Sequence, residues 1–233
     1  MIATAVIPVK RFRAAKRRLS AELAESDRPR LVLAMLDDVL AALGRASTIE
    51  RVIVVTGELR AERVALQQAK RLDRPVEVLR EARDHGHSEA ATLGALRATA
   101  LGAACVAMLP GDCPLLDPIE LDLAMTRMTD GRVAIIPDRH GTGTNGLLIS
   151  PPLAVTPAFG EGSRARHEQL VRDAGGEPAI EALSSMALDL DTGEDLAALR
   201  AELDSEPKRA PRTAAALAEL KATAKRRGSG ARA

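Results

Sequence analysis

Three aspartates are placed where carboxylates could hold a divalent cation. Asp112 follows an apolar run, and Asp189 and Asp191 are separated by one residue in a segment that reads as extended. Alternate residues of an extended segment face the same side, so the last two carboxylates can point at one site. Oxygen ligands suit Mg²⁺, and one or two such ions bridging phosphates would need carboxylates of this kind. We therefore predict a Mg²⁺ site at the three aspartates. A turn at Asp112 and a helix cap at Asp191 are the structural alternatives.

A basic segment follows the first apolar run, with six Lys or Arg residues between positions 10 and 18. Basic side chains just beyond a first strand are well placed to bind the triphosphate of a nucleotide. We expect Lys10, Lys16 and Arg17 to bind that triphosphate. The segment lacks glycine, so the phosphates would meet ammonium and guanidinium groups rather than a glycine-rich loop. A solvated basic loop is the alternative.

Two later segments, 137–146 and 159–167, combine glycines with Thr and Ser. Such segments expose backbone N–H groups, and Ser163 could open a helix whose N-terminus attracts an anion. We predict a pocket for a phosphate or carboxylate there. The four histidines show no metal-ligand spacing, and no serine has a nucleophile-elbow context, so covalent acyl chemistry is not expected.

Alternating patterns predict the elements that would position these residues. Strands are expected over residues 2–7, 51–56, 76–79, 104–109, 132–136 and 146–150. Helices are expected over 29–43, 60–71, 88–101 and 117–128, the last capped by Asp117 and opened by Pro118. This order indicates an α/β fold with a doubly wound, mainly parallel sheet, in which ligands bind beyond the carboxyl ends of the strands. A helix near 164–174 and a strand near 186–190 should follow.

Composition narrows the class of protein. The 233 residues include two Phe and no Trp or Tyr, so the core must be aliphatic and the stacking platforms of single-strand nucleic-acid binders are missing. The net charge is +1, and the two cysteines are too few for a disulfide framework. The N-terminal apolar run precedes its basic residues, the reverse of a signal peptide, and no stretch reaches membrane-spanning length. We expect a cytoplasmic location without nucleic-acid or membrane partners.

The organisation expected is one domain over residues 1–206 and a tail over 207–233. The tail carries eight basic residues and a single acid. We expect a solvated, poorly ordered terminus, helical in part, whose removal matters little for activity.

The chain resembles a known family over roughly positions 1–200, the guanylyltransferases of coenzyme F-420 synthesis. The motifs that carry the resemblance are Pro8-Val9-Lys10 with Lys16, and the segments 110–114, 137–145, 159–167 and 189–192. The resemblance implies a Rossmann-like nucleotidyltransferase (GT-A-like) fold with a mainly parallel mixed sheet flanked by helices. It also implies acceptor binding at Thr144, Gly160 and Ser163, metal ligation by Asp112, Asp189 and Asp191, and a catalytic role for Asp112, Lys10 and Lys16. Residues 85–90 depart from the family's Gly-Leu-Asn run, so no base-contacting residues are transferred to this chain.

The resemblance implies transfer of GMP from GTP to the phosphate of phosphoenolpyruvate or 2-phospho-L-lactate. The Arg-rich and Ala-rich composition is typical of actinobacterial proteins, and on that association we favour phosphoenolpyruvate as the acceptor. No general base is needed, because the acceptor phosphate is already ionised at neutral pH. A molybdopterin or sugar-phosphate nucleotidyltransferase is the first alternative, although it should show a glycine-rich first loop. A noncatalytic nucleic-acid-binding protein is the second. The oligomeric state stays open, with a homodimer as the candidate.

Overall fold

The computed structural model describes residues 3–12, 19–20, 22–83 and 86–230. They form one seven-stranded sheet in the order β3-β2-β1-β4-β6-β5-β7. All neighbouring strands are parallel except β6, which runs antiparallel to both β4 and β5. The strands are β1 (Ala3–Val9), β2 (Ile49–Thr56), β3 (Val76–Arg80), β4 (Cys105–Met108), β5 (Val133–Pro137), β6 (Thr144–Ile149) and β7 (Pro178–Ile180). The predicted mixed, mainly parallel sheet is therefore confirmed.

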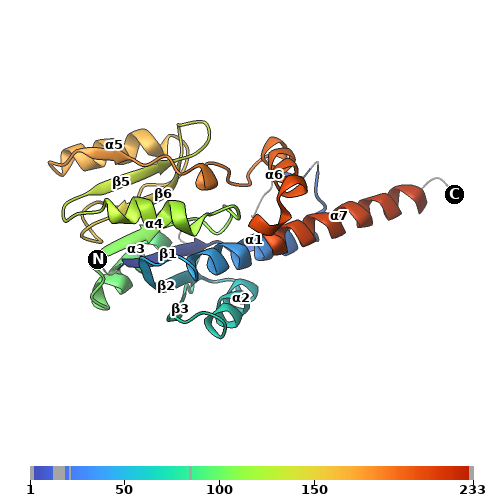
Figure 1. The fold of residues 1–233 in the computed structure, drawn as a ribbon, viewed down its shortest axis with the longest axis horizontal. Helices are drawn as coiled ribbons and strands as arrows, with labels where there is room; N and C mark the ends of the chain where they lie inside the picture. The colour runs from blue at the N-terminus through green and yellow to red at the C-terminus, as the bar shows by residue number, and fades with distance from the viewer. Residues whose placement is uncertain (1–2, 13–18, 21, 84–85, 231–233) are drawn as a thin grey trace.

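Helices cover both faces of this sheet (Figure 1). They are α1 (Arg28–Leu43), α2 (Leu59–Ala69), α3 (His87–Ala100), α4 (Pro118–Thr126), α5 (Ser163–Asp173), α6 (Gly193–Ser205) and α7 (Pro211–Gly230). Successive strand residues point to opposite faces. Ile7 of β1 accordingly joins the apolar cluster formed with α1, α2 and α4, whereas Val6 joins the one formed with α3 and α5. The result is a sheet between two helical layers.

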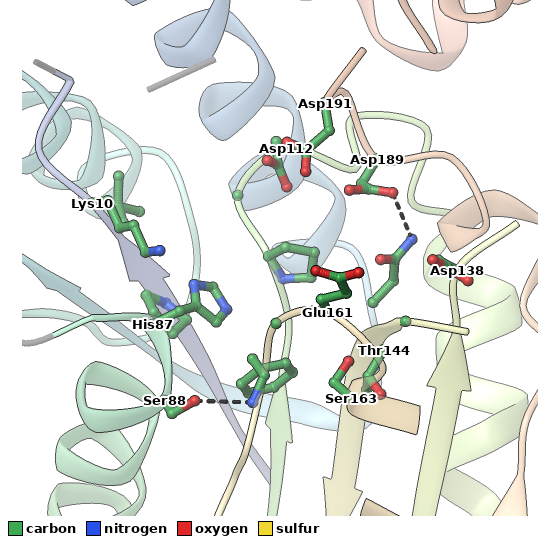
Figure 2. Close-up of a pocket in the computed structure, with 18 of the residues that line it drawn as sticks. Lys10, His87, Ser88, Asp112, Asp138, Thr144, Glu161, Ser163, Asp189 and Asp191 are labelled. Atoms are coloured by element: carbon green, nitrogen blue, oxygen red, sulfur yellow. Dashed lines mark hydrogen bonds between the residues drawn. The ribbon is translucent and has the colours of Figure 1, made fainter. Parts of the chain in front are cut away.

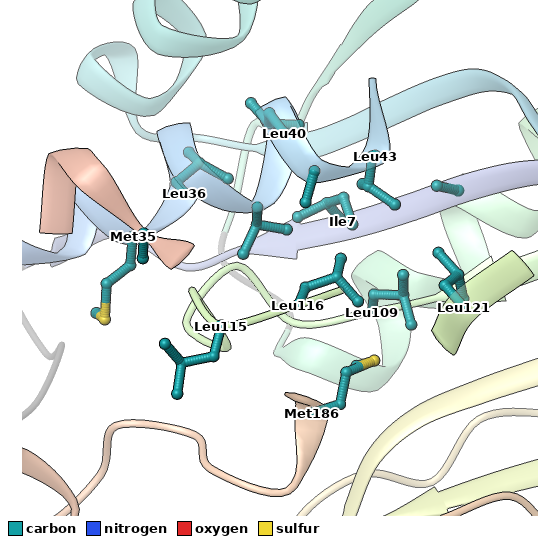
Figure 3. Close-up of a cluster of buried hydrophobic side chains, with 14 of the residues drawn as sticks. Ile7, Met35, Leu36, Leu40, Leu43, Leu109, Leu115, Leu116, Leu121 and Met186 are labelled. Atoms are coloured by element: carbon teal, nitrogen blue, oxygen red, sulfur yellow. The ribbon is translucent and has the colours of Figure 1, made fainter. Parts of the chain in front are cut away.

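Apart from Phe12, the buried side chains of the larger cluster are not aromatic, as the composition predicts (Figure 3). Ile7, Leu36 and Leu109 are each at most 1% exposed. Leu36 also lines the large pocket described below, so the core packing of α1 continues into the wall of that pocket. Cys105 and Cys113 are buried, as expected of small side chains, and burial raises the pKa of the Cys105 thiol to about 11.

Local sequence signals predict several boundaries correctly. The carboxylate of Asp117 accepts a hydrogen bond from the Ile119 backbone N–H at 2.7 Å, with Pro118 as the first residue of α4. The six expected strands and the four expected helices all form, with ends shifted by a few residues. Strand β7 was not predicted, because its three residues are too few to show alternation.

The strand predicted near residues 186–190 is wrong. A 3-10 helix, η3 (Ser184–Met186), precedes an irregular segment that no strand pairs with. The buried side chain of Asn145 holds this segment, donating from Nδ2 to the backbone oxygens of Met186 at 2.8 Å and Ala187 at 3.3 Å. Those side-chain bonds replace the ladder that a strand would have required.

The expectation of a solvated tail after residue 206 is also wrong for the part whose side chains are described. A short 3-10 helix, η4 (Pro207–Arg209), leads into α7, which packs along α1 and then projects beyond the sheet (Figure 1). Thr213, 0% exposed, donates from both its backbone N–H and its hydroxyl to Asp38 of α1, each at 2.8 Å. Leu217 and Leu220 complete the buried contact. Whether 206 divides two domains stays a prediction, but 207–223 is not a detached tail.

Among the helices that the structure describes, none combines the length and apolarity required to cross a bilayer.

Candidate active site

One large pocket opens beyond the carboxyl ends of β1 and β4, with a volume of about 760 Å³ (Figure 2). This is the edge where a parallel sheet is expected to bind ligands. The described residues that the sequence singled out all line it: Lys10, Asp112, Thr144, Gly160, Ser163, Asp189 and Asp191. Lys16 and Arg17 lie outside the described residues. Five segments far apart in the chain thus meet at one cavity large enough for a nucleotide and a small acceptor.

The three aspartates reach the pocket from two segments. Asp112 follows β4, and its backbone oxygen accepts a hydrogen bond from the Leu190 N–H at 3.3 Å. Leu190 is buried, and this bond holds it beside Asp112. Its two chain neighbours, Asp189 and Asp191, are therefore held near Asp112 as well. The sequence argument relied on strand alternation, yet it is this contact, together with Asn145, that brings the two segments to the same pocket (Figure 2).

A helix cap at Asp191, the structural alternative, is not what the structure has. Thr192 is the N-cap of α6, and it forms a reciprocal capping box with Asp195. Asp191 donates its backbone N–H to the Asp195 carboxylate at 3.0 Å, while its own side chain lines the pocket. The cap therefore leaves the Asp191 carboxylate facing the site.

The chemistry of this donor set fits Mg²⁺, because carboxylate oxygens are its usual protein ligands. Within the described part of the chain, however, no three His, Cys, Asp or Glu side chains are gathered into a ready metal site. The aspartates thus provide carboxylate oxygens at the pocket wall, but among the described residues they do not form a complete metal coordination sphere. Ligation by these residues stays a prediction.

The described pocket lining is strongly acidic. Five carboxylates, those of Asp112, Asp138, Glu161, Asp189 and Asp191, lie there, and Lys10 is the one Lys or Arg among the described lining residues. Anionic ligands would be repelled by this lining unless cations accompanied them. The sequence did not identify Asp138 or Glu161, although both stand inside the quoted motif segments.

The loop before α5 requires unusual backbone conformations. Gly160 and Gly162 have φ values of +118° and +64°, which side chains with a Cβ rarely adopt. Helix α5 begins at Ser163, as expected, and Gly162 is its N-cap. The Ser163 N–H already donates to Gly160 O at 3.0 Å, so the helix start offers an anion fewer backbone donors than its motif suggests. Besides these backbone groups, the side chains of Thr144 and Ser163 supply hydroxyl groups to this part of the pocket.

Two further lining residues, His87 and Ser88, start α3 and were missed by sequence reasoning. The Ser88 hydroxyl accepts a hydrogen bond from the Phe159 N–H at 2.9 Å, and the rings of His87 and Phe159 meet edge to face at 4.8 Å between centroids. These contacts join the α3 side of the pocket to the loop before α5. The available signal was that residues 85–90 stand where the resembled family has a Gly-Leu-Asn run at a helix start.

Comparison with known proteins identifies a family that the chain matches over most of its length. The model of a family described as guanylyl transferase CofC like matches residues 3–206. A phosphoenolpyruvate guanylyltransferase of Conexibacter woesei is 44% identical over 93% of this chain and 95% of its own length. A 3-phospho-D-glycerate guanylyltransferase of Phenylobacterium zucineum is 36% identical over 94% and 97%.

Solved structures show the same fold. A protein of Desulfovibrio desulfuricans described as a nucleotide-diphospho-sugar transferase superposes with a TM-score of 0.68 at 19% identity, covering 94% of this chain and 95% of its own. A nucleotidyl transferase from Methanothermobacter gives 0.63 at 19% identity, covering 87% and 97%. At such identities the likeness concerns the fold alone.

Proposed function

The chain belongs to the CofC-like guanylyl transferase family, and on that premise we propose that it transfers GMP from GTP to the phosphate of phosphoenolpyruvate. The enzyme class, nucleotidyltransferase, follows from the family. The acceptor is the proposed part, supported by the name of the 44% identical relative. The role proposed for the cell is a step in coenzyme F-420 synthesis.

One observation carries the proposal. A single pocket is lined by residues from segments distant in the chain. These residues are Lys10, the three aspartates, Thr144, Gly160 and Ser163. Such a cavity can hold a triphosphate and a second anion side by side. Lys10, with Lys16 and Arg17 of the adjoining segment, would contact the triphosphate.

The reaction is a displacement at phosphorus. A phosphate oxygen of the acceptor forms a bond to the α-phosphorus of GTP, the bond from that phosphorus to the bridging oxygen breaks, and diphosphate leaves with the electron pair. The nucleophile is already ionised at neutral pH, so no proton need be removed from it. Lys10 and Lys16 would neutralise charge on the transferring group and the departing diphosphate.

Asp112, Asp189 and Asp191 would hold one or two Mg²⁺ ions. A bound ion would neutralise phosphate charge and orient the phosphates for displacement. The acidic lining supports this assignment, because a triphosphate and a phosphorylated acid must otherwise enter among five carboxylates.

Thr144, Gly160 and Ser163 would bind the carboxylate of the acceptor on the opposite side of the site. The candidate acids share a carboxylate close to a phosphate, so neither group by itself selects among them. Discrimination by pocket shape is typically worth only ~1–3 kcal/mol. We therefore expect phosphoenolpyruvate to be preferred over 2-phospho-L-lactate and 3-phosphoglycerate without excluding either.

A diphosphate-release assay tests the proposal, with each nucleoside triphosphate against these three acids and the products separated by mass. Diphosphate release requiring GTP, and guanylylated phosphoenolpyruvate as the main product in an equimolar mixture, are expected. If the main product came from another acid, that acid would be the preferred acceptor in place of phosphoenolpyruvate. Diphosphate release with none of the three acids would refute the proposal altogether.

Two accompanying proposals concern the setting. We propose that the enzyme acts in the cytoplasm as a homodimer. Fractionation of the producing cells and the molecular mass in solution test these two points separately.

A further inference from the structure

His167 of α5 is completely buried, at 0% exposure, and both of its ring nitrogens have partners. Nε2 accepts a hydrogen bond from the Ala158 backbone N–H at 2.8 Å. Nδ1 lies 3.0 Å from the hydroxyl oxygen of Thr144. The ring therefore connects the first residue of β6 with the loop that precedes α5.

These two partners define the protonation of the ring. A backbone N–H can only donate, so Nε2 must carry no proton. A neutral imidazole has one N–H, which must then be on Nδ1 and donate to the Thr144 oxygen. The hydroxyl proton of Thr144 is consequently directed to some other acceptor, and Thr144 lines the pocket.

The surroundings keep the ring neutral. Burial lowers the pKa of His167 to about 4, and the nearby guanidinium of Arg166 acts in the same direction. Protonation would also put a hydrogen on Nε2 against the Ala158 N–H. At neutral pH the ring is thus a fixed donor on one side and a fixed acceptor on the other.

The loop that His167 holds is tied at several neighbouring points. Phe159 packs edge to face against His167, with 5.3 Å between ring centroids, and contacts His87 on its other side. Arg166 donates from Nη2 to the Ala158 backbone oxygen at 3.1 Å. Ala158, two residues before Gly160, is therefore held at both its N–H and its oxygen.

We propose that His167 is a positioning residue for acceptor binding, which orients the Thr144 hydroxyl proton into the pocket and fixes the loop that carries Gly160. The proposal rests on the proposed function, in which Thr144 and Gly160 contact the acceptor. His167 touches neither substrate. Its loss should therefore weaken acceptor binding and leave GTP binding unchanged.

Two near-isosteric variants separate its two hydrogen bonds. His167→Gln can keep an acceptor for the Ala158 N–H and loses the donor to Thr144, whereas His167→Asn can keep that donor and loses the acceptor. We expect each to raise the KM for phosphoenolpyruvate at least tenfold, with the KM for GTP changed less than twofold. Gln169→Ala, on the exposed side of α5, is the control and should change neither constant.

A double-mutant cycle distinguishes positioning from general packing. In a Thr144→Val background, His167→Gln should raise the KM for phosphoenolpyruvate less than threefold, since the hydroxyl it orients is gone. An unchanged effect in that background, or an equal rise in both KM values, would overturn the proposal.

Nitrogen NMR of the ¹⁵N-histidine-labelled wild type provides a readout independent of activity. We expect His167 to be the Nδ1–H tautomer and to remain neutral from pH 8 down to about 5.5. An Nε2–H tautomer, or protonation near pH 6.5, refutes the inference. A wild type that guanylylates none of the acids refutes the proposed function instead, and the tautomer then decides the inference alone.

Discussion

The side-chain nitrogen of Asn145 lies 3.3 Å from a carboxylate oxygen of Asp189 and donates to it (Figure 2). Asn145 is 6% exposed and belongs to β6, whereas Asp189 stands in an irregular segment. The same nitrogen also contacts the backbone oxygens of Met186 and Ala187. A strand of the sheet thus orients a carboxylate that no strand carries.

Replacing Asn145 by Ala should disturb the site without removing a proposed ligand. We expect kcat to fall by roughly 10–100-fold and the Mg²⁺ concentration for half-maximal rate to rise, because groups that orient ligands have effects of this size. Rates measured against Mg²⁺ concentration check this. A lower kcat with an unchanged Mg²⁺ requirement would show that Asn145 acts only on the fold.

The aspartates themselves should matter more. Asp112→Asn, Asp189→Asn and Asp191→Asn are each expected to lower turnover by at least two orders of magnitude, since charge neutralisation by a metal supplies several kcal/mol. Single-turnover rates of the folded variants measure this, with exposed Asp130→Asn as control. Near-normal rates in all three would place the metal site elsewhere.

Lys10→Ala and Lys16→Ala should each raise the KM for GTP and lower kcat. An ammonium group that contacts a phosphate stabilises both the bound substrate and the transition state. Initial rates over a range of GTP concentrations give both constants. Exposed Lys70→Ala, at the end of α2, should leave them unchanged, and equal behaviour of all three variants would argue against phosphate contacts.

Helix α7 should contribute to stability through Thr213. Burial raises the pKa of Asp38, and the hydrogen bonds from Thr213 act to lower it, so Thr213→Val leaves a buried carboxylate with fewer donors. We expect a loss of ~1–3 kcal/mol in the free energy of unfolding. Denaturant titration measures the loss.

Truncations extend that test. Deleting 207–233 should destabilise the protein by more than Thr213→Val, because Leu217 and Leu220 are lost as well. Ending the chain after residue 223 should have little effect on unfolding, since these buried contacts remain. Equal stability of the two truncated proteins would show that α7 contributes nothing.

Acid should destabilise the protein partly through His167. Its pKa is near 6.5 unfolded and about 4 folded, so between these values the unfolded state binds more protons. The stability that the neutral ring contributes is fully present above pH 6.5 and is lost as the pH falls to about 4. The total loss is roughly 3 kcal/mol in the free energy of unfolding. Unfolding measured from pH 7.5 to 4 should fall less steeply for His167→Gln. Parallel curves for the two proteins would contradict the shifted pKa.

Several features of the protein could be determined from the sequence because their causes are local. The Asp117 cap and the Pro118 helix start depend on neighbouring residues, and the apolar runs that form β1 and β4 are covered on both faces. The order of such elements implies a parallel sheet with its binding edge at the carboxyl ends. The position of Asp112 at that edge follows directly.

Other features were decided only by contacts between residues far apart in the chain. Asp189 lies beside the pocket because Asn145, 44 residues earlier, holds its segment, and alternation along a strand played no part. Helix α7 docks because Asp38 receives Thr213 from 175 residues away. A lone histidine at position 167 carries no local signal, and its neutrality comes from burial between β6 and the loop before α5. Local patterns record the conformational preferences of neighbouring residues, whereas the partner of a buried polar group is chosen only when the tertiary fold removes it from water.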